Sequence, residues 1–315
     1  MTLRITNQMI AGQTLRNLNA SLARLDDYNR QLSTGKRINL PEDDPAGAGI
    51  SMRLRTNVLE TEQYLQNAAD GLAWLTATDQ GLDQATLALQ RARSLVIYGG
   101  NDGLAQDSRD AIALEMSQLI EELIQIGNLK HADRHIFAGE NTLTPPFAPV
   151  YSDDGQRVIG VEYRGTTGDY SVQTDQDLAQ TLGLQQEIGP GIKMRISTHG
   201  DVALQPAIEA LIRARDRLEA GDVAGLSSES VAEIDGALDS ILSSRAEVGA
   251  RASRLEQVRS RLEQTHTNLL QLVSNREDAD MVEVIMRLKM EETVYQLALA
   301  SGARIIQPTL MDFLR

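Results

Sequence analysis

Two regular stripes of apolar residues, one near each end of the chain, constrain the fold of this sequence more than any other feature. In residues 278–315, apolar side chains recur every three or four positions, which places them on one face of a helix. Pro308 lacks a backbone donor and should end or kink this helix near Ile306. The stripe comprises Met281, Val284, Ile285, Leu288, Tyr295, Ala298, Leu299, Ile305 and Ile306, and a further apolar group follows at Leu310, Met311, Phe313 and Leu314.

The stripe near the start of the chain has the spacing of a coiled-coil seam. Its steps alternate between three and four residues through Leu15, Leu18, Leu22, Leu25, Asn29 and Leu32. Asn29 either sets the register of that seam or simply weakens it. We predict that the two ends pair, and that they supply an assembly interface. The predicted interface comprises Leu15, Leu18, Leu22, Leu25, Leu32, Met281, Ile285, Leu288, Tyr295, Leu299, Ile306 and Phe313.

Long helices are predicted between these ends. Residues 7–32 form the first helix, which stops before Gly35, a natural C-terminal cap. Residues 45–96 keep one apolar face for a rod of roughly 80 Å, because a helix rises 1.5 Å per residue. A third helix, over residues 108–131, should be its antiparallel neighbour after the glycine turn. Residues 228–272 form a further long helix, in which positions 255–272 keep heptad steps, and the rod of residues 45–96 is its expected partner.

Composition supports an extended helical protein over a compact enzyme. Aromatic residues are 3% of the 315 residues, whereas a compact core of this size normally uses more of them. The formal net charge of −14 disfavours nucleic acid and anionic membrane surfaces, because both require clustered Lys and Arg. Cysteine is absent, which excludes disulfides and thiolate chemistry. Residues 1–10 lack the apolar run of a secretory signal peptide, which by itself favours a cytosolic location. The sequence contains no run of about 18 apolar residues, which excludes a membrane-spanning helix.

The composition changes between residues 140 and 201, where proline, glycine and short alternating runs replace helical periodicity. Strands are predicted at residues 157–164, 170–174 and 192–197, with turns at residues 153–155 and 167–169. The predicted fold is therefore mainly α: an elongated bundle of long helices, with a coiled coil formed by the N- and C-terminal regions and a small inserted β-rich domain. The predicted domains are 1–40 plus 278–315, 41–139 plus 202–277, and 140–201.

Two residue groups could be interpreted as chemical sites. His131 and His135 are four residues apart, the spacing of a metal pair on one helix face, but they lack a nearby third ligand and are more typical of a solvated face. The acids at positions 42–44 precede Pro45, a strong helix start, and are more typical of helix caps than of a metal or acid–base cluster. We find no nucleophile–base constellation and no phosphate loop, so we predict no enzyme activity, no cofactor and no metal.

Four segments are distinctive: LRITNQM at residues 3–9, LSTGKRINLPEDDPAGA at residues 32–48, HIFAGENT at residues 135–142, and the whole of residues 278–315. Together they resemble the flagellin superfamily. The ending QPTLMDFLR is most similar to that of family members that join the flagellar hook to the filament. The resemblance covers residues 1–142 and 245–315 and hardly touches the middle of the chain.

The resemblance implies a structural protein at the hook–filament junction of the bacterial flagellum. Its implied partners are a hook-associated junction protein on the hook side, flagellin on the filament side, further copies of itself in a ring, and an export chaperone. It also implies export through the flagellar channel without a cleaved signal, and hence an extracellular location, in place of the cytosolic expectation above. The terminal helices would form an innermost layer, the rods a middle layer, and the β-rich insert the outer surface.

Three alternatives remain open at this point. The first is flagellin itself, the bulk filament subunit, which shares the terminal helices. The second is a binding or enzymatic module displayed on the filament through the insert, which would require a catalytic constellation in residues 140–201. The third is an intracellular coiled-coil scaffold, which the interrupting β-rich segment disfavours.

Overall fold

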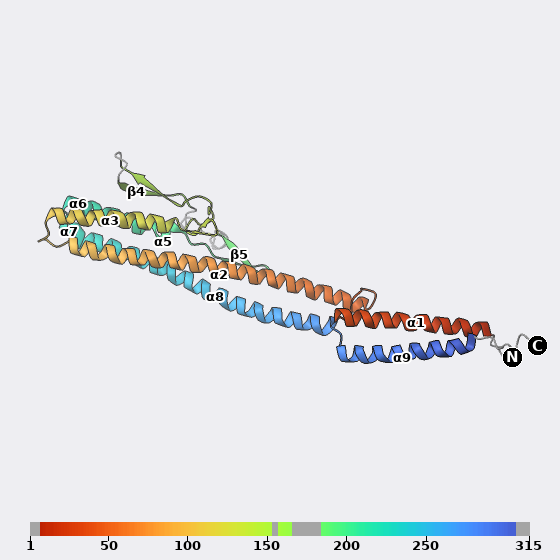
Figure 1. Ribbon diagram of the computed structural model, residues 1–315. Coiled ribbons are helices and arrows are strands. Elements are labelled where there is room, and N and C mark those ends of the chain that lie inside the picture. The colour runs from red at the N-terminus through yellow and green to blue at the C-terminus, as the bar shows by residue number, and fades with distance from the viewer. Residues whose placement is uncertain (1–6, 153–156, 166–183, 307–315) are drawn as a thin grey trace, which may run out of the picture. The chain divides into compact units, whose positions relative to one another are not determined.

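The computed structural model describes residues 7–152, 157–165 and 184–306. The chain divides into two compact units, one formed by residues 1–60 and 265–315 and the other by residues 61–264. The predicted mainly helical fold with a small inserted β region is confirmed (Figure 1).

The helices are α1 Asn7–Thr34, α2 Pro45–Gly99, α3 Gln106–Gly127, α5 Gly200–Ala203, α6 Gln205–Ala220, α7 Val223–Gly225, the π-helical turn η2 Leu226–Ser230, α8 Val231–Glu277 and α9 Met281–Ile306. The strands are β1 Lys130–His131, β2 Arg134–His135, β3 Phe147–Tyr151, β4 Val158–Tyr163, β5 Gln185–Gly189 and β6 Ile192–Arg195.

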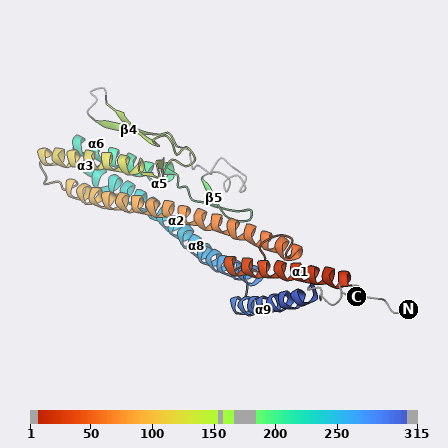
Figure 2. The same ribbon diagram turned by 45° about the vertical axis from the view of Figure 1, so that its right-hand side comes forward.

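The unit of residues 61–264 is a helical bundle with one apolar core. The core is formed by α3, α6 and the parts of α2 and α8 within this unit, with aliphatic side chains such as Leu82, Leu123 and Leu211 buried completely. The Nε atom of Arg91 on α2 donates to Glu115 on α3 over 2.7 Å, which fits the predicted antiparallel neighbours. The predicted pairing of α2 and α8 is also present, and the two helices run side by side in Figures 1 and 2. Ion pairs between Arg245 of α8 and Asp79 and Asp83 of α2 join them.

Among the described residues of the same unit, three two-stranded antiparallel hairpins interrupt the helical pattern. They are β1–β2, β3–β4 and β5–β6, and the second and third contain register shifts. The strands predicted at residues 157–164 and 192–197 correspond to β4 and β6. The strand predicted at residues 170–174 and the turns predicted at residues 153–155 and 167–169 lie outside the described residues.

Helix α3 ends at Gly127, whereas the sequence predicts that it continues to His131. The Asn128 side chain donates to the carbonyl of Phe147 over 2.8 Å and accepts from its backbone amide over 3.0 Å, which turns the chain toward β3. The ring of Phe147 also packs so closely on Gly127 that a Cβ atom there would lie 2.4 Å from it. The helix end is therefore set by contacts with a distant strand and not by the local sequence.

The unit of residues 1–60 and 265–315 contains a pair of terminal helices. Helix α1 lies beside α9 in both views (Figures 1 and 2). Gly35, at a φ of +70°, ends α1 at the position predicted for a C-terminal cap, and its amide donates to the Gln31 carbonyl. A linker of residues 35–44 leads to α2, and residues 278–280 separate α8 from α9.

Candidate assembly surface

Helices α1 and α9 form an antiparallel pair. Ser21 lies opposite Glu291, and a Cβ atom on Gly302 would contact Thr14, so residue numbers fall along α9 as they rise along α1. The less exposed positions on both helices alternate in steps of three and four, which is the pattern of a coiled-coil seam. The seam comprises Thr14, Leu18, Ser21, Leu25, Tyr28 and Leu32 on α1, and Val284, Leu288, Glu291, Tyr295, Ala298 and Gly302 on α9.

The structure places the predicted interface residues of α1 in two different environments. Leu18, Leu25 and Leu32 lie in the seam, as the sequence predicts. In contrast, Leu15 is 55% exposed and Leu22 46% exposed, and Asn29 is exposed as well, so none of these three is a seam residue. Thr14, Ser21 and Tyr28, each one residue earlier, take the seam positions instead. The leucine pattern therefore gave the correct period but the wrong residue at every second position.

The predicted residues of α9 divide in the same way. Leu288 is buried and Tyr295 half-buried within the seam, whereas Met281, Ile285 and Leu299 are exposed. Ile306 is the last residue of α9, and Phe313 lies outside the described residues.

The centre of the seam is polar. Ser21, only 2% exposed, donates its hydroxyl to the Oε1 atom of Glu291 over 2.5 Å, and Arg24 donates to the same oxygen over 2.6 Å. These hydrogen bonds, from Arg24 first and then Ser21, lower the pKa of Glu291. A polar group in a coiled-coil seam specifies register but contributes less stability than an apolar one. The network therefore explains how α1 and α9 align, and predicts that the pair alone is weakly held.

The exposed predicted residues gather on one side of the pair. Apart from Met281, each follows a seam position by one residue, which is a turn of about 100° around a helix. Because the two helices run in opposite directions, this turn leads to the same side of the pair in both. We call this side the apolar edge. It comprises Leu15, Leu22, Ile285 and Leu299, with Asn29 and Glu292 between them.

Helix α9 also exposes a second apolar surface away from α1, which we call the outer stripe. Its residues are spaced three or four apart and are largely exposed: Val282, Met286, Met290, Val294 and Leu297. Contiguous exposed apolar surface of this kind marks an interaction site in a water-soluble protein. The outer stripe is not among the residues predicted from the sequence, although a helix sequence that is apolar on more than one face could have indicated it.

The linker beside the helix pair is fastened by one buried carboxylate, which we call the Glu277 clamp. Glu277, at the end of α8, accepts hydrogen bonds from Ser51 and Arg55 of α2 and from Lys36 of the linker. These donors, Arg55 foremost, lower the pKa of Glu277 to about 2 despite its burial. The backbone adds to the clamp, because the amide of Arg37 donates to the Glu277 carbonyl over 2.6 Å and that of Ala279 to the Gly35 carbonyl over 2.9 Å.

Two of the acids near position 43 are helix and turn caps, as predicted. Asp44 accepts from the amide of Gly47 over 2.8 Å at the start of α2. Asp43 accepts from the amides of Asn39 and Leu40, which lowers its pKa. Glu42 is exposed.

The metal interpretation of the histidine pair is not supported by its geometry. His131 and His135 lie on β1 and β2 of a hairpin, and not on one face of a helix. The Nδ1 atom of His135 lies 2.8 Å from the Asn128 carbonyl, and His131 packs edge-on against Trp74. Burial lowers the pKa of His135. Within the described ranges, no three His, Cys, Asp or Glu residues group closely enough to hold a metal ion.

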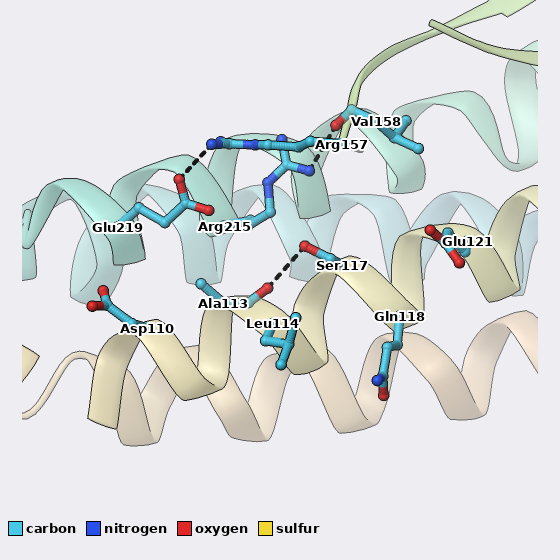
Figure 3. A pocket seen from close by; sticks show the side chains of 10 residues that line it. All are labelled: Asp110, Ala113, Leu114, Ser117, Gln118, Glu121, Arg157, Val158, Arg215 and Glu219. Atoms are coloured by element: carbon cyan, nitrogen blue, oxygen red, sulfur yellow. Dashed lines mark hydrogen bonds and ion pairs between the residues drawn. The ribbon is translucent and has the colours of Figure 1, made fainter. Parts of the chain in front are cut away.

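A cleft of about 370 Å³ lies between α3 and α6 beside the start of β4 (Figure 3). Arg215 is fully buried there and donates to the carbonyl of Val158 over 2.6 Å and to Asp216 over 2.8 Å. Arg157 pairs with Glu219 over 2.6 Å. Because these arginines bind acceptors on the neighbouring elements, we interpret the cleft as the place where the β3–β4 hairpin is attached to α6.

Comparison with known proteins identifies the family. The model of the bacterial flagellin N-terminal helical region matches residues 5–142, and that of the C-terminal helical region matches residues 231–314. The chain belongs to the flagellin family. It is thus a structural component of the bacterial flagellum, as the resemblance implied. Among the helices that the structure describes, none is long and apolar enough to cross a membrane.

Two kinds of curated relatives match along most of the chain. Flagellar hook-associated protein 3 of Escherichia coli (strain K12) is 27% identical over 311 residues, covering 93% of this chain and 94% of that protein. Flagellin of Bacillus subtilis (strain 168) is 26% identical over 313 residues, covering 97% of each.

Solved structures confirm the fold. FlgL of Bacillus cereus superposes with a TM-score of 0.56 at 23% identity, covering 70% of this chain and 99% of that one. A putative flagellar hook-associated protein of Vibrio parahaemolyticus gives a TM-score of 0.63 at 15% identity, covering 75% and 100%.

Proposed function

We propose that this chain forms the layer that joins the hook to the filament, and that the α1–α9 pair is its assembly surface. Its neighbours would be a hook-associated junction protein on the hook side and flagellin on the filament side, with further copies of itself completing a ring. The role is mechanical and requires no catalysis. Support comes from the similarity to hook-associated protein 3 and from the exposed apolar faces of the terminal helices.

The apolar edge is the observation that carries this proposal. Its four apolar residues are each about half exposed in the single chain. Burying such a side chain fully is worth 1.5–3 kcal/mol, so covering the exposed half of each contributes roughly 1 kcal/mol per residue. The outer stripe adds five more apolar residues, most of them more exposed. Contributions of about 1 kcal/mol from each of several residues add up to a stable contact between subunits in an assembled layer.

The polar seam fits the same role. A helix pair held by a serine and a glutamate at its centre gains little stability alone, and helices obtain most of their stability from packing. We therefore infer that neighbouring subunits complete the packing of α1 and α9 after export through the flagellar channel to the cell exterior. Before export, an export chaperone would cover the exposed apolar faces. The three-domain division of inner pair, helical rods and outer insert remains our prediction.

Bulk flagellin is the second candidate, because the Bacillus subtilis flagellin matches nearly the full length of both chains. The two roles differ in where the protein lies. A junction protein occupies one narrow band between hook and filament, whereas flagellin occupies the whole filament. Immunogold labelling of intact flagella distinguishes them, and label along the filament would establish the flagellin role instead.

The assembly surface is tested by a double substitution, Leu22→Asp with Leu299→Asp, in a strain that lacks the wild-type gene. Ile159→Asp is the matched control, because Ile159 is half exposed on β4. We expect the edge variant to melt as wild type in purified form, since both residues are exposed, yet to abolish attached filaments and swimming. Normal motility of the edge variant, or loss of motility in the control alone, would contradict an assembly role for this edge.

A further inference from the structure

A groove of about 200 Å³ lies between the α1–α2 linker and the first turns of α2, beside the Glu277 clamp. The linker forms one side and α2 the other, and five of the nine lining residues are apolar. Met52 is 59% exposed on the α2 wall and Leu40 is 40% exposed on the linker wall. The remaining apolar lining residues are Ile38, Pro41 and Ala48.

The groove is held in shape by polar contacts, several of which come from its own lining residues Asn39, Ser51, Arg55 and Glu277. Asp43 fixes the linker by accepting from two linker amides, and Asp44 caps the adjoining start of α2. At its end the Glu277 clamp joins Ser51 and Arg55 to the close of α8. A preformed groove binds an extended segment with a smaller ordering cost than a mobile surface does.

The sequence contains one apolar segment suited to such a groove. Residues 310–314 read LMDFL, with four apolar side chains around Asp312. The matched C-terminal family region extends to residue 314, so residues 307–315 serve as the probe for the corresponding segment of a flagellin-family neighbour. Methionine adapts its shape to different apolar partners, and Met52 therefore allows the segment of a related but non-identical chain to fit.

The segment of the same chain cannot reach its own groove. Helix α9 has 26 residues and so spans about 39 Å, and the groove lies beside the end of α8, next to the start of α9. The nine residues after Ile306 span at most about 32 Å when fully extended. A C-terminal segment that occupies the groove must therefore come from another subunit. That subunit would be displaced along the direction of the α1–α9 pair by about the length of the pair.

We propose that the groove receives the apolar C-terminal segment of a neighbouring flagellin-family subunit in the adjacent layer. This inference rests on the proposed role as a layer of the flagellum. Each subunit would thereby bind a subunit of the adjacent layer through a segment-in-groove contact, distinct from the contacts of the apolar edge. The sequence motif at residues 32–48 then has a direct role in assembly, in addition to connecting two helices.

The test uses a fluorescently labelled peptide of residues 307–315 and the purified full-length chain. We expect saturable binding by anisotropy, weakened at least tenfold by Met52→Lys on the protein or by Phe313→Asp in the peptide. Leu59→Lys is the matched control, because Leu59 is exposed on the same helix seven residues further on, and it should leave binding unchanged. Equal binding by Met52→Lys, or no binding by the wild type, would overturn the proposal.

A photo-cross-linking group at position 313 of the peptide provides a second readout. We expect adducts on residues 38–52, identified by mass spectrometry, and adducts on the apolar edge or outer stripe instead would refute the groove. The Leu22→Asp and Leu299→Asp motility test remains independent of this result. If the peptide fails to bind while that variant abolishes filaments, the groove assignment fails and the assembly function stands. If the peptide binds the groove while that variant swims normally, the assembly role of the edge fails.

Discussion

Replacing Glu277 by Gln should loosen the linker between α1 and α2 without unfolding the helical bundle of residues 61–264. A pKa of about 2, compared with an ordinary value of 4.5, corresponds to roughly 3 kcal/mol of stabilisation at neutral pH. Glutamine keeps the size of the side chain but not its charge, and Arg55 is half exposed, so water replaces part of the lost interaction. We therefore expect a loss of about 1.5–3 kcal/mol in local stability.

Hydrogen exchange with mass spectrometry measures this loss directly. Amide protection in residues 35–44 should fall by about tenfold to a hundredfold at pH 7, since 1.4 kcal/mol corresponds to a factor of ten. Trp74 lies in the other compact unit, and its fluorescence melting curve should change little. Glu263→Gln is the control, because Glu263 is exposed on the same helix and its ion pair with Arg259 contributes at most about 1 kcal/mol.

The pH dependence supplies a second check with a fixed sign. Because the folded pKa of Glu277 is lower than the unfolded one, its contribution is complete above about pH 5 and is lost as the pH falls through 4.5 toward 2. Wild-type protection of the linker should therefore decline over this window after correction for the intrinsic exchange rate, and the Gln variant should show a smaller decline. Identical protection of both proteins at neutral pH would refute the clamp as a stabilising element.

Two further substitutions test the seam and the end of α3. Replacing both Ser21 and Glu291 by Leu should stabilise the α1–α9 pair by roughly 1–3 kcal/mol, because apolar seam residues pack better than a hydrogen-bonded polar pair. The gain should be measured as slower amide exchange in both helices. Faster exchange would show that the polar network is the more stable arrangement. Asn128→Ala should lower the stability of the bundle by about 1–3 kcal/mol, since it removes two hydrogen bonds to Phe147. The loss is measured by denaturant unfolding followed by Trp74 fluorescence. An unchanged denaturant midpoint would contradict the explanation that Asn128 and Phe147 end α3 at Gly127.

The long helices were predictable because their apolar periodicity is local and continuous. Gly35 and the acids before Pro45 also marked boundaries correctly, since capping depends on adjacent residues. The seam of the terminal pair was only partly predictable. A stripe of leucines at positions 15 and 22 indicates the same period as the true seam at positions 14 and 21, and only the contact between Ser21 and Glu291, 270 residues apart, decides between them.

The remaining differences also arise from distant contacts. The end of α3 depends on Phe147, and the apparent helical spacing of His131 and His135 is a consequence of a hairpin that turns at Ala132 and Asp133, both with positive φ. The Glu277 clamp was missed because its members lie at positions 36, 51, 55 and 277. Its carboxylate sits at the C-terminal end of a helix, where the helix dipole disfavours an acid, and this is a signal that could have been noticed.

The most direct test of the assembly surface uses the absence of cysteine from this chain. Single substitutions Leu22→Cys and Ile159→Cys each introduce one thiol, at positions similarly exposed in the free chain. Their rates of maleimide labelling are compared in the purified protein and in isolated flagella. We predict that both thiols react readily in the purified protein, and that in flagella the thiol at position 22 reacts at least tenfold more slowly while the one at position 159 keeps its rate. An unchanged rate at position 22 in assembled flagella would contradict the burial of the apolar edge between subunits.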